Sequence, residues 1–199
     1  MPKTGKVKKG YAISIENVAP FLWYRVGISD KSEVGIRVGL PIYGSGVDYS
    51  RVLYKKKNKW DMLNLAWSLN PNYNLDATYY KFKTKKTDTD FLKSRWLGFR
   101  MMSIQKGITG GTSNRFGFLY GIQSSPRWGM EFGYFHDSSS IPITDIFSSE
   151  WDPFSSENHD RYSKKPTRDE SSGLPSEFSR MTGLSFSLFF DLDAPKKKK

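Results

Sequence analysis

The strongest constraint on the fold is a stretch near the end of the chain, Gly183–Asp193, in which large apolar residues occupy every second position. Successive side chains of a β-strand point to opposite faces, so one face of this stretch is apolar and the other carries mainly hydroxyls and carboxylates. The alternation continues over about ten residues, the length that a tilted strand needs to cross a bilayer. The stretch therefore predicts a membrane-spanning strand with one lipid-facing side.

The same alternation recurs along the chain and predicts an all-β fold. Polar or glycine-containing turns separate most of the alternating segments, as antiparallel hairpins require, and no helical periodicity of useful length is present. An even number of strands suits an antiparallel up-and-down transmembrane β-barrel. The ten expected strands are Lys9–Val18, Phe21–Ser29, Glu33–Ile42, Val47–Tyr54, Lys59–Leu69, Tyr73–Lys83, Ser94–Ile104, Arg115–Ser124, Trp128–His136 and Gly183–Asp193.

One segment interrupts the pattern and predicts a long acidic loop before the last strand. Residues 137–179 hold nine of the chain's 20 acidic residues, although the chain as a whole has a net charge of +11. We expect one barrel domain over 9–193 that includes this loop, a polar basic lead-in over 1–8 and a basic tail over 194–199. Because the last strand of such barrels ends in the periplasm, the loop is expected outside the cell.

The apolar face of the strands predicts a lipid-facing surface bounded by aromatic girdles, because Tyr and Trp favour the headgroup zone. Arg51 shares this face, at a cost of about 2–4 kcal/mol if it lies at the midplane. We expect it to reach an interface or a β-bulge to reverse its facing. The lipid-facing residues are Val34, Ile36, Val38, Leu97, Phe99, Phe116, Phe118, Met130, Phe132, Leu184, Phe186, Leu188 and Phe190, and the girdle residues are Tyr11, Tyr24, Trp67, Tyr73, Tyr79, Trp128 and Tyr134.

The opposite face carries charges of both signs and many glycines. A ten-stranded barrel has a narrow interior, so we expect these charges to pair into a network that largely fills the lumen, in preference to lining a selective channel. Glycines on this face, such as Gly121, ease crowding in such a lumen. The predicted lumen network comprises Arg25, Arg37, Asp48, Asp76, Arg100, Glu131 and Asp191, and Glu16 has the same parity.

The basic character of the chain does not indicate nucleic-acid binding. Lys and Arg gather at the termini and in connections, in Lys3–Lys9, Lys55–Lys59, Lys81–Lys86 and Lys196–Lys199. A nucleic-acid groove instead places them along one face between stacking aromatic residues. The expected partners are outer-membrane lipid and the barrel insertion machinery, and the sequence leaves a homo-oligomer open.

Catalysis and metal binding find little support. His136-Asp137-Ser138 contains the residue types of a hydrolase, but neighbours on a strand point to opposite faces and cannot form the relay by themselves. A second histidine, His159, lies in the acidic loop, which lacks the spacing of a calcium-binding loop. The chain has no Cys. We therefore expect no enzymatic activity, no cofactor and no metal.

A recognisable pattern in the first quarter of the chain is carried by Tyr24–Asp30, Lys31, Ser32, Val34–Gly39 and Gly46–Tyr49. It resembles the start of small bacterial outer-membrane β-barrel proteins, many of which open with a lipid-anchored cysteine and repeat a motif of the kind YGLTDKxDLGxRLG. The resemblance implies an outer-membrane location and a barrel, but no activity. Two features depart from the family pattern: the anchoring cysteine is absent, and the last aromatic residue is followed by DLDAPKKKK. No signal peptide is visible in MPKTGKVKKG.

Two other function classes stay open beside a structural or narrow-pore barrel of a Gram-negative outer membrane. A soluble lipocalin-like barrel would turn its apolar side chains inward around a hydrophobic ligand. A lipid-modifying enzyme of the outer membrane would use His136. The direction in which the apolar face points separates the first alternative from the membrane barrel.

Overall fold

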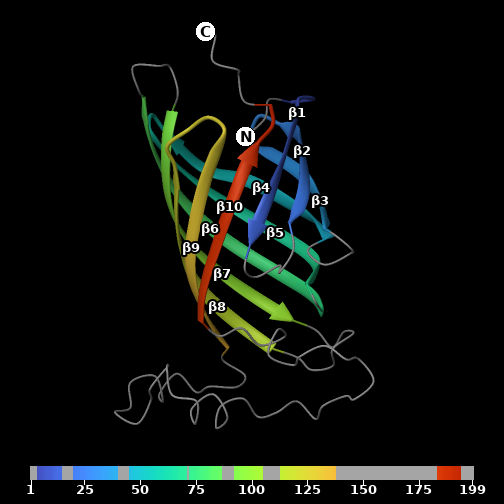
Figure 1. Cartoon of the computed structure of the whole chain (residues 1–199). Helices are drawn as coiled ribbons and strands as arrows, with labels where there is room; N and C mark the ends of the chain where they lie inside the picture. The colour runs from blue at the N-terminus through green and yellow to red at the C-terminus, as the bar shows by residue number, and fades with distance from the viewer. Residues whose placement is uncertain are drawn as a thin grey trace, which may run out of the picture.

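In the computed structural model, the chain forms a closed ten-stranded antiparallel β-barrel (Figure 1). Each strand pairs with its neighbours in sequence, and β1 pairs with β10 to close the ring. The all-β antiparallel barrel predicted from the alternation is thus confirmed. The structure describes residues 4–14, 20–39, 45–70, 72–86, 92–104, 113–137 and 183–193. The strands are β1 Val7–Ser14, β2 Phe21–Ser29, β3 Ser32–Gly39, β4 Ser45–Lys56, β5 Lys59–Asn70, β6 Asn72–Lys86, β7 Leu92–Ile104, β8 Ser113–Gln123, β9 Trp128–Asp137 and β10 Gly183–Asp191.

The strand boundaries differ from the expected ones mainly at the barrel ends. β1 begins at Val7, so the end of the expected lead-in pairs with β2, and β6 continues as far as Lys86. Alternation reveals a strand only where one face is buried, and at these ends Lys residues point to both sides. Asp137 belongs to β9, while the rest of the expected loop and the tail 194–199 lie outside the described residues. Residues 15–18 of the expected first strand and residues 40–42 of the expected third strand also lie outside them. Within the described ranges, no helix is long and apolar enough to cross a membrane.

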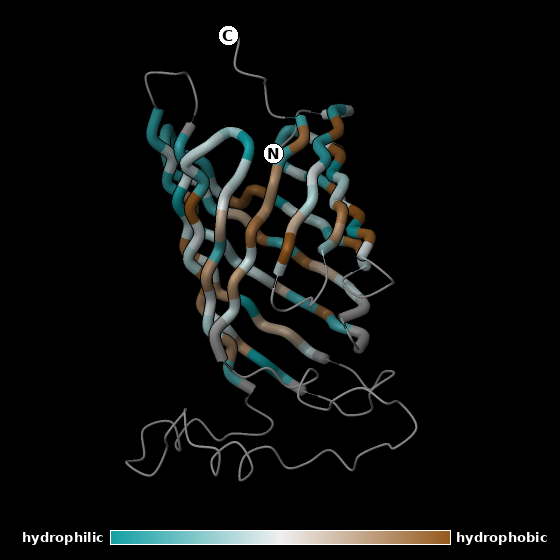
Figure 2. Tube along the Cα trace, in the orientation of Figure 1, coloured by the Kyte–Doolittle hydropathy of each residue, from teal (hydrophilic) through white to brown (hydrophobic). Residues whose placement is uncertain are grey.

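The apolar face of the strands points outward and the small, polar face points inward. Phe118 and Leu97 are 63% and 62% exposed, whereas Gly121 and Asp48 are buried. Figure 2 shows hydrophobic and hydrophilic residues alternating along the strands, with hydrophilic residues gathered where β6 and β7 extend beyond their neighbours. This facing is the reverse of that in a soluble barrel that encloses a hydrophobic ligand.

Inward glycines let aromatic rings lie against the neighbouring strand. A Cβ atom on Gly121 would overlap the indole ring of Trp96, and a Cβ atom on Gly129 would overlap the ring of Phe189. The glycines therefore provide the space that these rings occupy, and a larger residue at either position would displace a ring toward the middle of the lumen.

Arg51 faces outward in spite of its charge. It lies opposite Ser32 of β3 and Leu63 of β5, and its side chain is exposed. The register of β4 shifts between Val52 and Tyr54, so a β-bulge lies just after Arg51 in the strand. A β-bulge was one of the two ways in which Arg51 was expected to avoid the lipid. The observed bulge lies after Arg51, so it does not turn the Arg51 side chain inward. Instead it turns the end of β4, where Tyr54 is 53% exposed.

Candidate functional site in the barrel lumen

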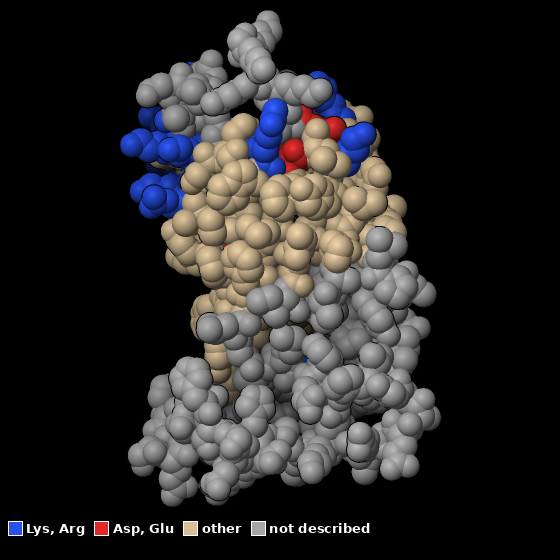
Figure 3. Space-filling view, viewed as in Figure 1, with Lys and Arg blue, Asp and Glu red and all other residues tan. Residues whose placement is uncertain are grey.

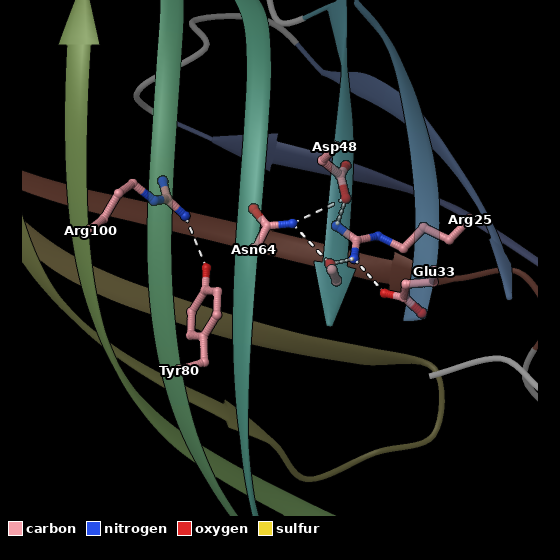
Figure 4. Close-up of polar contacts among 7 residues, drawn as sticks. Arg25, Glu33, Asp48, Asn64, Tyr80 and Arg100 are labelled. Atoms are coloured by element: carbon pink, nitrogen blue, oxygen red, sulfur yellow. Dashed lines mark hydrogen bonds and ion pairs between the residues drawn. The ribbon is translucent and has the colours of Figure 1, made fainter. Parts of the chain in front are cut away.

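The first group of lumen residues, the Arg25 cluster, links β2 to β5 and consists of Arg25, Glu33, Asp48, Ser50 and Asn64. The guanidinium of Arg25 lies 2.7 Å from the Glu33 carboxylate and 3.1 Å from that of Asp48. Asn64 donates from Nδ2 to Asp48 at 3.2 Å and to Ser50 at 2.9 Å (Figure 4). The two carboxylate side chains are only 5% and 3% exposed. One cation thus forms ion pairs with two buried anions from different strands.

The second group, the Arg100 cluster, links β6, β7 and β9 and consists of Thr78, Tyr80, Trp96, Arg100 and Glu131. Arg100 donates from Nε to the Thr78 hydroxyl at 2.9 Å. It also donates from Nη2 to the Tyr80 hydroxyl at 3.0 Å (Figure 4). Glu131 lies 3.8 Å from Arg100 and accepts a hydrogen bond of 2.6 Å from the indole N–H of Trp96. Hydrogen bonds to charged groups are stronger than neutral ones, so this cluster holds three strands in register.

The remaining predicted lumen residues take different positions. Arg37 lies between the clusters, where Asp48 and Asp76 attract it, and its Nε and Nη2 atoms are buried without a hydrogen-bond partner. Asp191 lies at the barrel end, 3.9 Å from Lys8. The structure therefore brings six of the seven predicted residues into the two clusters or close to them, with Arg37 and Asp76 beside the clusters, and places Asp191 apart at the rim. Glu16 lies outside the described residues.

Glu33 is the functional residue that the sequence analysis did not place in the lumen. It is 4% exposed and bound to Arg25. Its parity in β3 is that of Gly35 and Arg37, so the alternation alone contained the signal. It was missed because the expected third strand began at Glu33, where a terminal residue is easily assigned to a turn.

Large aromatic rings cover much of the inner wall at the barrel end that holds the start of β1 and the end of β10. The rings of Trp60 and Phe82 stack with their centroids 3.8 Å apart, and Phe82 lies 5.5 Å from Trp96. Trp96 of β7 in turn has its ring centroid 5.8 Å from that of Phe189 of β10, although β8 and β9 lie between these two strands. We call these four residues the aromatic lining. An eight-stranded barrel is filled by its side chains, and the four rings occupy part of the wider lumen of this ten-stranded one.

The predicted outer-surface residues lie on the outward-facing parity wherever their side chains are described, and the side chains of Leu184 and Tyr73 are not described. Tyr11 stacks on Phe190 with ring centroids 4.5 Å apart, and Tyr79 donates from its hydroxyl to Asp61 at 2.8 Å. Tyr79 lies in the middle of β6, but the outward residues that follow it are lysines. It therefore marks one edge of the apolar band.

His136 lies on the outward-facing parity of β9 and is fully buried. Its ring is 5.3 Å from that of Phe116, and its Nδ1 lies 3.4 Å from the Tyr134 hydroxyl. His159 lies outside the described residues. In the part of the chain that the structure describes, no three His, Asp or Glu residues come together as a metal site.

The comparisons with known proteins return little. No model of a known protein family matches the chain, and no curated protein is similar to it in sequence. A solved structure described as "NanC porin structure in rhombohedral crystal form" matches with a TM-score of 0.32 and 9% sequence identity, over 92% of this chain and 97% of that chain. The resemblance within Tyr24–Tyr49 to small outer-membrane barrel proteins accordingly stays a prediction.

Proposed function

We propose that this chain is an integral barrel of a Gram-negative outer membrane, with a structural role and a lumen too narrow for solutes of appreciable size. The observation that carries the proposal is the direction of the two faces. Exposed side chains such as Phe118 and Leu97 would each cost free energy in water, about 1.5–3 kcal/mol per large apolar group, whereas hydrocarbon accepts them. A water-soluble carrier would have the opposite arrangement.

The lumen supports the non-catalytic part of the proposal. The Arg25 and Arg100 clusters pair their charges with one another, and the aromatic lining occupies the space toward one end. His136, the candidate base of an enzyme, lies buried on the outer wall beside Phe116. These contacts favour a rigid wall over a catalytic or conducting site. The partners that this function requires are membrane lipid and the insertion machinery.

Fractionation followed by a heat-modifiability gel tests the proposal. The chain should appear in the outer-membrane fraction, and the unboiled protein should migrate faster than the boiled protein, because a closed barrel stays folded in detergent. Purified barrel added to planar bilayers should give little or no conductance. Recovery in the soluble fraction without detergent would overturn the membrane assignment, and large steady conductance would overturn the filled lumen.

A further inference from the structure

One outer wall of the barrel, formed by β4–β7, carries a row of cations that face one another. Lys59 of β5 lies directly opposite Lys56 of β4 and Lys83 of β6, and Lys83 lies opposite Arg95 of β7. We call these four residues the basic row. All are exposed, and the described part of the chain provides none of them with an ion pair. Like charges directly opposite each other destabilise a sheet, so an anionic partner would stabilise this wall.

The surroundings of the basic row have the same sign. Lys81, Lys85 and Lys93 point outward beside it, and Figure 3 shows Lys and Arg side chains gathered at the end of the barrel that holds the start of β1 and the end of β10. Asp61 is the one carboxylate on this wall among the described residues, and it accepts the hydroxyl hydrogen bond of Tyr79. The wall therefore has an excess of positive charge next to the apolar band.

An apolar groove of about 980 Å³ follows the same wall from β3 to β8, and its lining combines outward side chains with residues of inward parity such as Asp48 and Asp76. Leu65, Trp67, Leu75 and Met101 are among the outward side chains that line it. The strand from Lys59 to Ala66 rises roughly 24 Å at about 3.4 Å per residue, and a strand tilt of about 40° makes this roughly 18 Å of depth. The hydrocarbon core of one leaflet is about 15 Å thick, so the groove lies at the depth that an acyl chain reaches from the basic row.

We propose that the β4–β7 wall binds an anionic phospholipid, with the phosphate on the basic row and an acyl chain in the apolar groove. The inference rests on the proposed function, because it needs the wall to face lipid. Lys and Arg bind phosphate through charge-assisted hydrogen bonds. The basic row lies at the end that holds the start of β1 and the end of β10, which is periplasmic in the proposed orientation. The ligand is therefore a phospholipid of the inner leaflet.

Electron paramagnetic resonance with spin-labelled lipids tests the headgroup contact. The whole chain is inserted into phosphatidylcholine vesicles, and the association of labelled phosphatidylglycerol is compared with that of labelled phosphatidylcholine. Each cation that contacts the phosphate should favour the anionic lipid by about fivefold at low salt. The variant Lys59→Gln/Lys83→Gln/Arg95→Gln keeps only Lys56 of the row and should reduce the preference to about fivefold or less.

A matched control removes the same charge from the connections at the same end. Lys31→Gln/Lys57→Gln/Arg127→Gln should keep the preference, and Lys59→Arg/Lys83→Arg, which keeps the charge of the row, should keep it too. Equal losses in the row variant and the control would overturn the site, because net charge alone would then explain the binding. A stronger preference for lipid A than for phosphatidylglycerol at equal phosphate content would overturn the inner-leaflet assignment.

The acyl-chain contact is tested separately by filling the groove. Ala77, which lines the groove, faces outward between Leu65 and Met101, and Ala77→Phe should weaken the association of both labelled lipids by a similar factor. Unchanged association would overturn this half of the proposal. Heat modifiability in pure phosphatidylcholine is measured for every variant. A wild-type chain that fails to insert there contradicts the proposed function, whereas an inserted barrel without lipid preference contradicts only this inference.

Discussion

Replacing Arg25 by Met should destabilise the barrel more than any other single change to a lumen charge. Arg25 is the cation that pairs with both Glu33 and Asp48, at 2.7 and 3.1 Å, and the two carboxylate side chains are 5% and 3% exposed. Breaking a buried ion pair from one side costs about 3–5 kcal/mol, because the remaining charge stays buried without compensation. The Arg25 side chain is itself 30% exposed, which lowers the expected loss to about 2–4 kcal/mol.

The loss is measurable as a change in the free energy of unfolding by urea in lipid vesicles, followed by tryptophan fluorescence. Lys8→Met is the matched control, because Lys8 forms a longer and more exposed ion pair, 3.9 Å from Asp191 with 47% of its side chain exposed. That variant should lose less than about 1 kcal/mol.

A second comparison separates uncompensated charge from lost packing. Arg25→Met/Glu33→Gln removes one charge of each sign, leaves Asp48 beside Arg37, and should recover part of the lost stability, because Glu33 is then no longer a buried charge without a cation. Equal stability of Arg25→Met and Lys8→Met would contradict the prediction, and so would a double variant that is no more stable than Arg25→Met. Either result would mean that water, and not Arg25, compensates the two carboxylates.

Three further predictions concern the lumen wall and the outer surface. Trp96→Ala/Phe189→Ala should raise single-channel conductance in planar bilayers above that of the wild type, because it removes two rings of the aromatic lining; unchanged conductance would show that other groups close the lumen. Gly121→Ala should lower the free energy of unfolding by about 1–3 kcal/mol through overpacking against Trp96, and a much smaller loss is expected in a Trp96→Ala background. Phe118→Arg should destabilise the vesicle-inserted barrel by about 2–4 kcal/mol if it faces the midplane, whereas the same change on a water-exposed surface would have little effect.

The number and facing of the strands could be predicted from the sequence because the side-chain period of a strand is two and the apolar face is continuous. β2 has the predicted bounds, Phe21–Ser29, since turn residues flank it on one side and Pro20 precedes it. The bulge of β4 could not be predicted. It reverses which residues of β4 face outward within Val52–Lys56. After the bulge this segment carries Lys residues on both faces, so the sequence shows no alternation that would indicate the reversal.

The membership of the lumen network was predictable, but its pairing was not. Parity places Arg25, Asp48 and Asn64 on one face without stating which strands lie opposite in the closed ring. Contacts between side chains of strands that are not neighbours, such as that of Trp96 with Phe189 over β8 and β9, depend on the curvature of the wall and on the glycines below the rings. From the sequence, the inward glycines were expected only to reduce crowding in the lumen. In the structure, Gly121 lies under the ring of Trp96 and Gly129 under the ring of Phe189.

The pairing of β1 with β10 joins the two strands that lie furthest apart in the sequence. Ser187 donates to Ser14 across this seam at 3.0 Å, and Leu192 donates its backbone N–H to the carbonyl of Lys9 at 3.0 Å. Until β10 pairs with β1, β1 presents an unpaired edge, and so does the last strand that has joined the sheet. Such edges recruit other chains. Protection against aggregation therefore depends on one closing event, and a substitution that slows the docking of β10 would leave both edges of the open sheet unpaired for the same interval.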